Sequence, residues 1–317
     1  MNPRRKTRAA ARTGKGGGHF GDGLAAGART ILADARQALS GPALSESEAV
    51  HSLRKALKRW RAFLRLIERP VGAPAETMRA EARELMRMLA SARDAQSALD
   101  ALDDLRKSKM PLAATSAQTI RARLTEMRDA AQTASFTPET RERLAHYLDY
   151  AVLSLERWAL AEIEFDAIAD GLAATYRRAR QLVPDDWARA EPEHLHDLRR
   201  RVVEHRHQID LIAPLWREQG KLWAQKAQRL RNRLGACQDL EVLSRLTAPH
   251  QPLARWRSRL AAAIAARRAA HLRTAARLSA RLFVDKPKAF RKRIAAALTR
   301  RVLKRKKART SGVQRTA

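Results

Sequence analysis

Cysteine is almost absent from this sequence, and its scarcity excludes several kinds of site. Cys237 is the one cysteine among 317 residues. A disulfide framework within the chain and a zinc site built on paired cysteines are therefore excluded. So little cysteine fits a reducing compartment, and we expect a cytoplasmic protein.

Long apolar runs are also missing. A helix that spans a bilayer needs about 20 predominantly apolar residues, and no stretch of the sequence approaches that composition. The opening residues, MNPRRKTRAAARTGKGGGHF, are basic but lack the apolar segment of a signal peptide. We expect neither secretion nor a membrane span.

Acidic residues are heavily outnumbered. Lys and Arg total 64 against 33 Asp and Glu, which gives a net charge of +31. Such a surplus implies a polyanionic partner or an anionic surface, but it does not choose among nucleic acid, polyphosphate and membrane. With 45% hydrophobic residues, a chain of 317 residues is long enough for about two domains with real cores.

Recognisable catalytic motifs are lacking as well. There is no glycine-rich phosphate loop, no dinucleotide-binding fingerprint and no histidine pair spaced for zinc. His205 and His207 are two residues apart and would point to different faces of a helix. Ser52 and Lys55 fit an S-x-x-K pattern, but no companion motif follows. We predict no catalytic residue, no cofactor and no metal, and hence no enzyme.

The sequence does contain an unusually pure cationic helix at residues 49–67, AVHSLRKALKRWRAFLRLI. Its cations step by three and four residues along one face, and its large apolar residues do the same on the other face. The cationic stripe is His51, Arg54, Lys58, Arg61 and Arg65, and the apolar stripe is Leu53, Leu57, Trp60, Leu64 and Ile67. The alternative explanation is an ordinary solvated face, but this stretch has no acid with which its cations could pair.

The same block returns later in the chain as LHDLRRRVVEHRHQIDLI, from Leu195 to Ile212. A companion block, LASARDAQSAL from Leu89, returns as LGACQDLEVLS from Leu234. The separation from His51 to His196 equals that from Asp94 to Asp239. The sequence therefore predicts a duplicated unit whose length equals this separation.

No segment shows a convincing strand pattern, so we predict an all-α fold. Helices are expected near residues 22–39, 49–67, 75–107, 115–131, 138–160, 170–183, 193–216, 219–246 and 253–282. We divide the chain into a disordered basic arm (1–18), a first helical repeat (19–165), a second helical repeat (166–300) and a basic tail (301–317).

The doubled histidine blocks carry a resemblance to a known family. V-H-x-L-R-K-x-L-K-R-x-R at 50–61, with A-R-D at 92–94, is repeated as L-H-x-L-R-R-R-V at 195–202 with L-G-x-x-x-D at 234–239. These motifs, together with T-Y-R-R-x-R at 175–180, resemble the CHAD family over about residues 20–290. The resemblance implies two similar helical bundles related by a pseudo-twofold axis, with basic surfaces that bind inorganic polyphosphate without hydrolysing it.

The resemblance also implies a set of binding residues. The set is His51, Arg54, Lys55, Lys58, Arg61, Arg65 and Arg93 in the first half, Tyr176, Arg177 and Arg180 in the middle motif, and His196, Arg199, Arg200 and Arg206 in the second half. Guanidinium groups bind phosphate oxygens in pairs, and a histidine beside phosphates is favoured in its charged form. Asp94 and Asp239 are interpreted as acids that orient neighbouring cations, with ordinary helix-surface aspartates as the alternative.

The second half departs from this pattern in a way that weakens its cationic stripe. Val203 and Glu204 stand opposite Lys58 and Arg59 of the first half. Asp210 replaces the cation at Arg65, and Gln238 replaces Arg93. The contribution of the second half is therefore expected to be the smaller one.

Inorganic polyphosphate is the partner that this reading favours, with a location in the cytoplasm or on polyphosphate granules. A nucleic-acid or nucleoid-associated protein is the main alternative, and the same charge allows weak nucleic-acid binding. No helix-turn-helix, RNA-binding signature or aromatic platform supports that alternative. A basic scaffold for other proteins is the third possibility, and the oligomeric state is not predicted.

Overall fold

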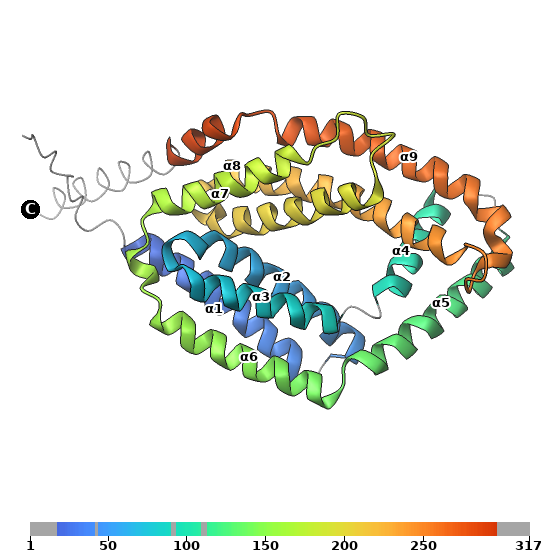
Figure 1. Ribbon diagram of the computed structural model, residues 1–317, viewed down its shortest axis with the longest axis horizontal. Helices are drawn as coiled ribbons and strands as arrows, with labels where there is room; N and C mark the ends of the chain where they lie inside the picture. Colours follow the sequence, from blue (N-terminus) through green and yellow to red (C-terminus); the bar gives the residue numbers. More distant parts are fainter. Residues whose placement is uncertain (1–17, 42–43, 90–92, 109–112, 297–317) are drawn as a thin grey trace, which may run out of the picture.

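The structure is a computed structural model that describes residues 18–41, 44–89, 93–108 and 113–296. These residues form helices and contain no strand, which confirms the predicted all-α class (Figure 1). The elements are α1 (Gly18–Ser40), α2 (Glu46–Val71), α3 (Ala73–Met88), α4 (Arg93–Lys107), α5 (Ala114–Ser135), α6 (Pro138–Arg157), η1 (Leu160–Glu162), α7 (Phe165–Gln181), α8 (Pro192–Leu246), η2 (Ala254–Trp256) and α9 (Arg257–Leu282). Residues 287–296 are also helical. The predicted arm (1–18) and tail (301–317) lie outside the described residues, apart from Gly18.

Helix α2 has clear local signals at both ends. Ser45 accepts a hydrogen bond from the backbone N–H of Glu48, and the Glu48 side chain accepts one from the backbone N–H of Ser45. This capping box satisfies free N–H groups at the start of the helix. At the other end, Gly72 has a φ of 80°, a conformation that glycine adopts without strain. Every residue of the predicted apolar stripe is buried, so the amphipathic interpretation is confirmed.

Helix α8 is helical from end to end by hydrogen bonding, yet it folds back on itself. Arg199 and Gln238 are 39 residues apart, which is about 58 Å along a straight helix. Arg199 Nη1 nevertheless donates to Gln238 Oε1 at 2.9 Å. A Cβ on Gly220 would lie 3.2 Å from Ala213 Cα, which locates the reversal between these two residues. We refer to residues 192–212 as the first limb and residues 221–246 as the second limb.

The predicted helices are present, but several of their ends differ: α7 begins at residue 165 instead of 170, and α9 begins at residue 257, after η2, instead of 253. The long helix expected over 75–107 is two helices, α3 and α4, separated at residues 89–92. The helix expected to reach residue 160 ends at Arg157, and η1 follows. The two limbs of α8 match the helices expected at 193–216 and 219–246.

The hydrophobic core crosses the boundary between the predicted repeats. The larger cluster of buried residues joins α1, α2, α3 and α6 to α7 and α8. In the smaller cluster, Leu102 and Leu105 of α4 pack with Leu240 of α8 and Ile264 of α9. The first half thus sends α4 into the second half, and Figure 1 shows α4 beside the far end of α8. The internal duplication and its pseudo-twofold axis stay predictions.

Candidate anion-binding site

Five cations from three helices converge where α2, α4 and both limbs of α8 meet. We call them the central cluster: Arg54 and Lys58 on α2, Arg93 on α4, and Arg199 and Arg231 on the two limbs of α8. Burial and the positive charges of four arginines, Arg54, Arg199, Arg93 and Arg231, together lower the pKa of Lys58 to about 7. The cluster therefore carries more positive charge than its surroundings neutralise.

Two guanidinium groups of the central cluster are held by neutral acceptors. Arg54 donates to the carbonyl oxygen of Leu89, and Arg199 donates to Gln238 Oε1. Burial, followed by the charge of Arg93, lowers the pKa of both arginines to about 10. Nε of Arg199 is buried without a hydrogen-bond partner. Such a donor is available to an oxygen atom of a ligand.

The backbone of α8 leaves room for Arg199. A Cβ on Gly235 would lie 3.4 Å from Arg199 Nε and 3.6 Å from Nη2. A side chain larger than alanine at this position would therefore displace the guanidinium group.

The acid predicted to orient cations in the second half lies within the cluster. Asp239 is hydrogen-bonded to Ser97, and its pKa is raised by burial and lowered by Arg199 and Arg93. Asp94 is exposed at the start of α4, where its charge raises the pKa of Arg54. The position of Asp94 is that of a helix-surface aspartate, and the orienting role of both acids stays a prediction.

The two equivalent histidines have different surroundings. His51 is exposed near the start of α2. His196 is partly buried and shares a side-chain hydrogen bond with Gln238, while its Nδ1 is buried without a partner. Burial, together with Arg93, Arg199 and Arg200, lowers the pKa of His196. The arginines thus oppose its charged form until an anion arrives.

The end of the α2 stripe is largely neutralised by acids. Arg65 Nη1 donates to Glu68 at 2.9 Å, and its Nε lies 3.3 Å from Glu204 of α8. Glu68 also accepts from Arg79 at 3.0 Å, and Glu204 accepts from Arg201 at 3.0 Å. We call these residues the ion-pair network. Burial lowers the pKa of the adjacent Arg61, and Glu204 raises it. Arg65 is therefore already paired.

The remaining predicted cations of α2 and α8 lie at the surface. Lys55 and Arg200 are exposed, and Arg200 pairs with Asp197 at 3.2 Å. Arg206 pairs with Asp210 at 3.1 Å. Asp210, the acid that stands where the first half has Arg65, thus neutralises Arg206 on the same helix.

The structure corrects the role predicted for Tyr176. Its side chain is fully buried, stacks on Phe290 and donates a hydrogen bond to the carbonyl oxygen of Asp285 at 2.9 Å. Arg180 Nε donates to the carbonyl oxygen of Phe283 at 3.2 Å. Arg177 is exposed on the same helix. Tyr176 and Arg180 thus tie α7 to the segment after α9, and the central cluster does not include them.

Sequence reasoning missed three relevant residues. Arg231 lies about two helical turns before Gln238, so extending the face of Gln238 backwards would have found it. Arg178 stands between the two predicted arginines of α7. Its Nη1 is buried without a hydrogen-bond partner, and burial together with the nearby positive charge of Arg65 lowers its pKa. His207 is buried next to Lys58, and its pKa is lowered to about 3 by burial and by Arg206, Arg59 and Lys58. Local periodicity gave no signal for His207.

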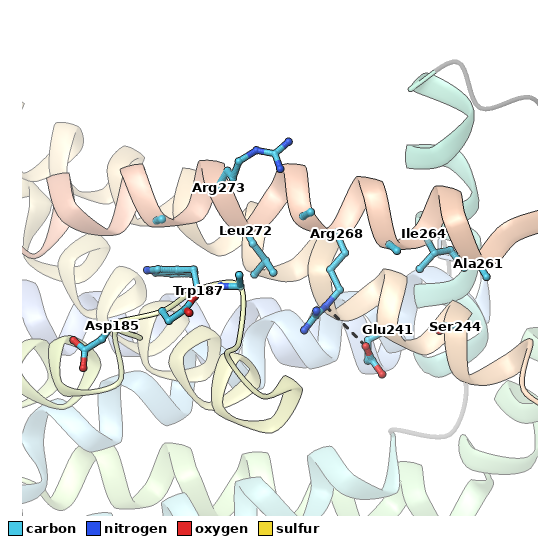
Figure 2. Close-up of a pocket in the computed structure, with 14 residues that line it drawn as sticks. Asp185, Trp187, Glu241, Ser244, Ala261, Ile264, Arg268, Leu272 and Arg273 are labelled. Atoms are coloured by element: carbon cyan, nitrogen blue, oxygen red, sulfur yellow. Dashed lines mark hydrogen bonds and ion pairs between the residues drawn. The ribbon is translucent and has the colours of Figure 1, made fainter.

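A cavity of about 880 Å³ lies elsewhere, between α9, the second limb of α8 and residues 185–188. Trp187, Ile264 and Leu272 line it, and Figure 2 shows Glu241 at one side with its ion pair to Arg268. Three acids, Asp185, Asp186 and Glu241, line this cavity together with two arginines, Arg268 and Arg273, so its lining has no excess of positive charge. The central cluster is the stronger anion site.

Two general absences hold over the part of the chain that the structure describes. None of its helices is long and apolar enough to cross a membrane. Its histidines, cysteine and acids form no group of three that could hold a metal ion.

Comparison with known proteins identifies the family. The CHAD domain family model matches residues 23–248, and the chain therefore belongs to the CHAD family, which is associated with polyphosphate. The match ends before α9, short of the residue 290 that the motifs suggested.

Two solved structures share the fold. PptA from Streptomyces chartreusis has a TM-score of 0.57 and 18% sequence identity, with 83% of this chain and 97% of that chain covered. The CHAD domain from the plant Ricinus communis has a TM-score of 0.54 and 18% identity, with 88% of this chain and 91% of that chain covered. No curated protein matches this sequence.

Proposed function

We propose that this protein binds inorganic polyphosphate at the central cluster and does not hydrolyse it. The observation that carries the proposal is the convergence of Lys58 with four arginines from α2, α4 and both limbs of α8, with the buried Nε of Arg199 left without a partner. Like charges held together in a partly buried site are relieved by an anion. A chain of phosphates presents many oxygens to several guanidinium groups at once.

The cluster favours phosphate over the nucleic-acid alternative. Proteins that bind single-stranded nucleic acid combine cations with aromatic side chains on which bases stack. The aromatic residue nearest in the sequence, Trp60, is buried and donates to Tyr147 Oη at 2.8 Å. No aromatic side chain on which a nucleobase could stack lies among the five cations. The cluster therefore offers contacts to phosphate groups and none to nucleobases.

A matched pair of variants tests the site. Arg199→Gln removes a cluster cation, whereas Arg206→Gln removes the same charge from the same limb at a position already paired with Asp210. We expect Arg199→Gln to weaken polyphosphate binding about tenfold or more, since a charged hydrogen bond contributes about 1.5–3 kcal/mol, and Arg206→Gln to weaken it less. Titration at physiological salt measures both.

Two further measurements complete the test. Duplex DNA is used as competitor, and a preference for DNA over long polyphosphate would favour the nucleic-acid reading. Release of inorganic phosphate is followed over hours in the presence of added divalent cations. Sustained release that Arg199→Gln abolishes would contradict the non-hydrolytic part of the proposal.

A further inference from the structure

Helix α9 is cationic without compensating acids. The sequence has no Asp or Glu between Glu241 and Asp285, and α9 lies inside that stretch and beyond the residues that the family model matches. Helix α5 of the first half, by contrast, does contain acids. On that helix Arg123 pairs with Glu126 at 3.2 Å. The charge on α9 therefore needs a partner from outside the helix.

Five of the arginines of α9 form two groups. On the inner side, Arg267 pairs with Asp104 of α4 at 2.6 Å, and Arg268 lies 4.0 Å from Glu241 of α8. On the outer side, Arg273, Arg277 and Arg281 follow one another at intervals of four residues and are exposed. We call these three residues the outer stripe. Figure 2 shows Arg273 directed away from Glu241 and Trp187.

The outer stripe has no ion pair with any residue that the structure describes. Among the described residues, the side chains of the outer stripe make one hydrogen bond, which Arg277 Nη2 donates to Thr274 Oγ1 at 3.5 Å. Like charges four residues apart on a helix repel one another and destabilise it. A bound polyanion would remove this repulsion.

The second limb of α8 separates the outer stripe from the central cluster. Arg231 on this limb belongs to the cluster, whereas Arg233 reaches α9, where its Nη1 lies 3.2 Å from His271 Nδ1. His271 is buried beneath α9, and the outer stripe lies on the opposite side of that helix. The two cationic surfaces are therefore distinct, with Arg233 and His271 between them.

We propose that the outer stripe is a second polyphosphate-binding surface, which takes the continuation of a long chain whose other part occupies the central cluster. This inference rests on the proposed function. A second contact made by the same ligand acts at a high effective concentration and raises affinity without changing the first site. The stripe thus makes the protein selective for long chains.

The test compares a long-chain polyphosphate with inorganic tripolyphosphate, which is too short to occupy both surfaces. The stripe variant is Arg273→Gln, Arg277→Gln and Arg281→Gln. The control variant is Arg29→Gln, Arg143→Gln and Arg157→Gln, which removes the same charge from exposed positions on α1 and α6. Circular dichroism verifies that both remain helical.

We expect the stripe variant to lose about tenfold or more in affinity for the long chain, at the lower end of typical avidity gains. The affinity of the stripe variant for tripolyphosphate should equal that of the control variant. If both variants lost the same affinity for the long chain, the inference would be overturned, and the outer stripe would be an ordinary solvated face of α9. A loss confined to duplex DNA or to anionic vesicles would overturn it as well, because the partner would be another polyanion. Failure of the unaltered protein to bind tripolyphosphate would instead contradict the proposed function.

Discussion

Lys58 is the residue at which charge crowding is most visible. An exposed lysine has a pKa of about 10.4, whereas burial and four arginines bring that of Lys58 to about 7. The protonation of this side chain therefore changes within the neutral range of pH in the free protein. Its charge state then depends on whether an anion is bound.

The first prediction is that polyphosphate binding takes up protons near pH 7. A bound anion raises the pKa of Lys58 above 7, so affinity is highest below pH 7 and falls as the pH rises through the pKa of the complex. Titration calorimetry in two buffers of different ionisation enthalpy measures the uptake. Lys58→Met should remove it.

His196 contributes to the same linkage at lower pH. Burial and the nearby arginines lower its pKa in the free protein, and a bound anion should raise it, so His196→Gln should remove the more acidic part of the proton uptake but spare the uptake near pH 7. If neither variant changed the pH dependence, the charges of the site would have to be compensated in some other way.

At the scale of single helices, Glu204 has the largest effect on the cationic stripe of α2. It reaches from the first limb of α8 to Arg65 at 3.3 Å and raises the pKa of Arg61. Glu204 thus weakens the cationic stripe of the first half as well as that of the second half, in which it stands. On α2, the ion-pair network neutralises the Arg65 end of the stripe, so the unpaired positive charge of this helix lies toward Arg54 and Lys58.

The second prediction follows from that neutralisation. Glu204→Gln keeps a polar side chain of the same size but releases Arg61, Arg65 and Arg201, so polyphosphate should bind several-fold more tightly. Glu142→Gln on the exposed face of α6 is the matched control for the change in net charge. If both variants gained equally, the effect would be one of overall charge, and Glu204 would have no special place.

The reversal of α8 supports a third prediction, about stability. A Cβ on Gly220 would lie 3.1 Å from Trp216 Cβ and 3.2 Å from Ala213 Cα, closer than ordinary packing. Gly220→Ala should therefore destabilise the protein by about 1–3 kcal/mol. Gly23→Ala in α1 has open space around it and should stabilise by about 0.5–1 kcal/mol. Denaturant unfolding compares the two, and a neutral Gly220→Ala would show that the turn tolerates a side chain.

At the scale of the whole molecule, one buried group of charges joins α4 to α9. Asp104 accepts two hydrogen bonds from Arg267, at 2.8 and 2.6 Å, and lies 2.7 Å from His271 Nε2. Burial raises the pKa of Asp104, but the bonds from Arg267 and His271 outweigh it and bring the value to about 2. This group holds the last helix against the first half of the chain.

The fourth prediction concerns acid unfolding. Because the pKa of Asp104 is lowered on folding, its stabilising effect is present above its ordinary value of about 3.9 and is lost as the pH falls toward 2. Asp104→Asn should lower the free energy of unfolding at pH 7 and flatten its decline between pH 4 and 2. Asp103→Asn is the control, since its pair with Arg121 is at the surface. Identical acid unfolding in both variants would contradict the argument.

The sequence alone determined the all-α class, the amphipathic register of α2 and the family. These properties depend on residues within a few helical turns of one another, where the 3.6-residue period fixes which side chains share a face. The apolar stripe from Leu53 to Ile67 was predictable for that reason. So was the cationic stripe opposite it, as a set of positions.

The tertiary structure decided which of those cations are free to bind. Arg65 is neutralised by Glu204, Tyr176 is buried under Phe290, and Arg231 joins Lys58 because α8 folds back on itself. Each outcome depends on distances between residues that are far apart in the chain. Electrostatic interactions depend on separation in space and on burial, and helical periodicity carries no information about either beyond a single helix.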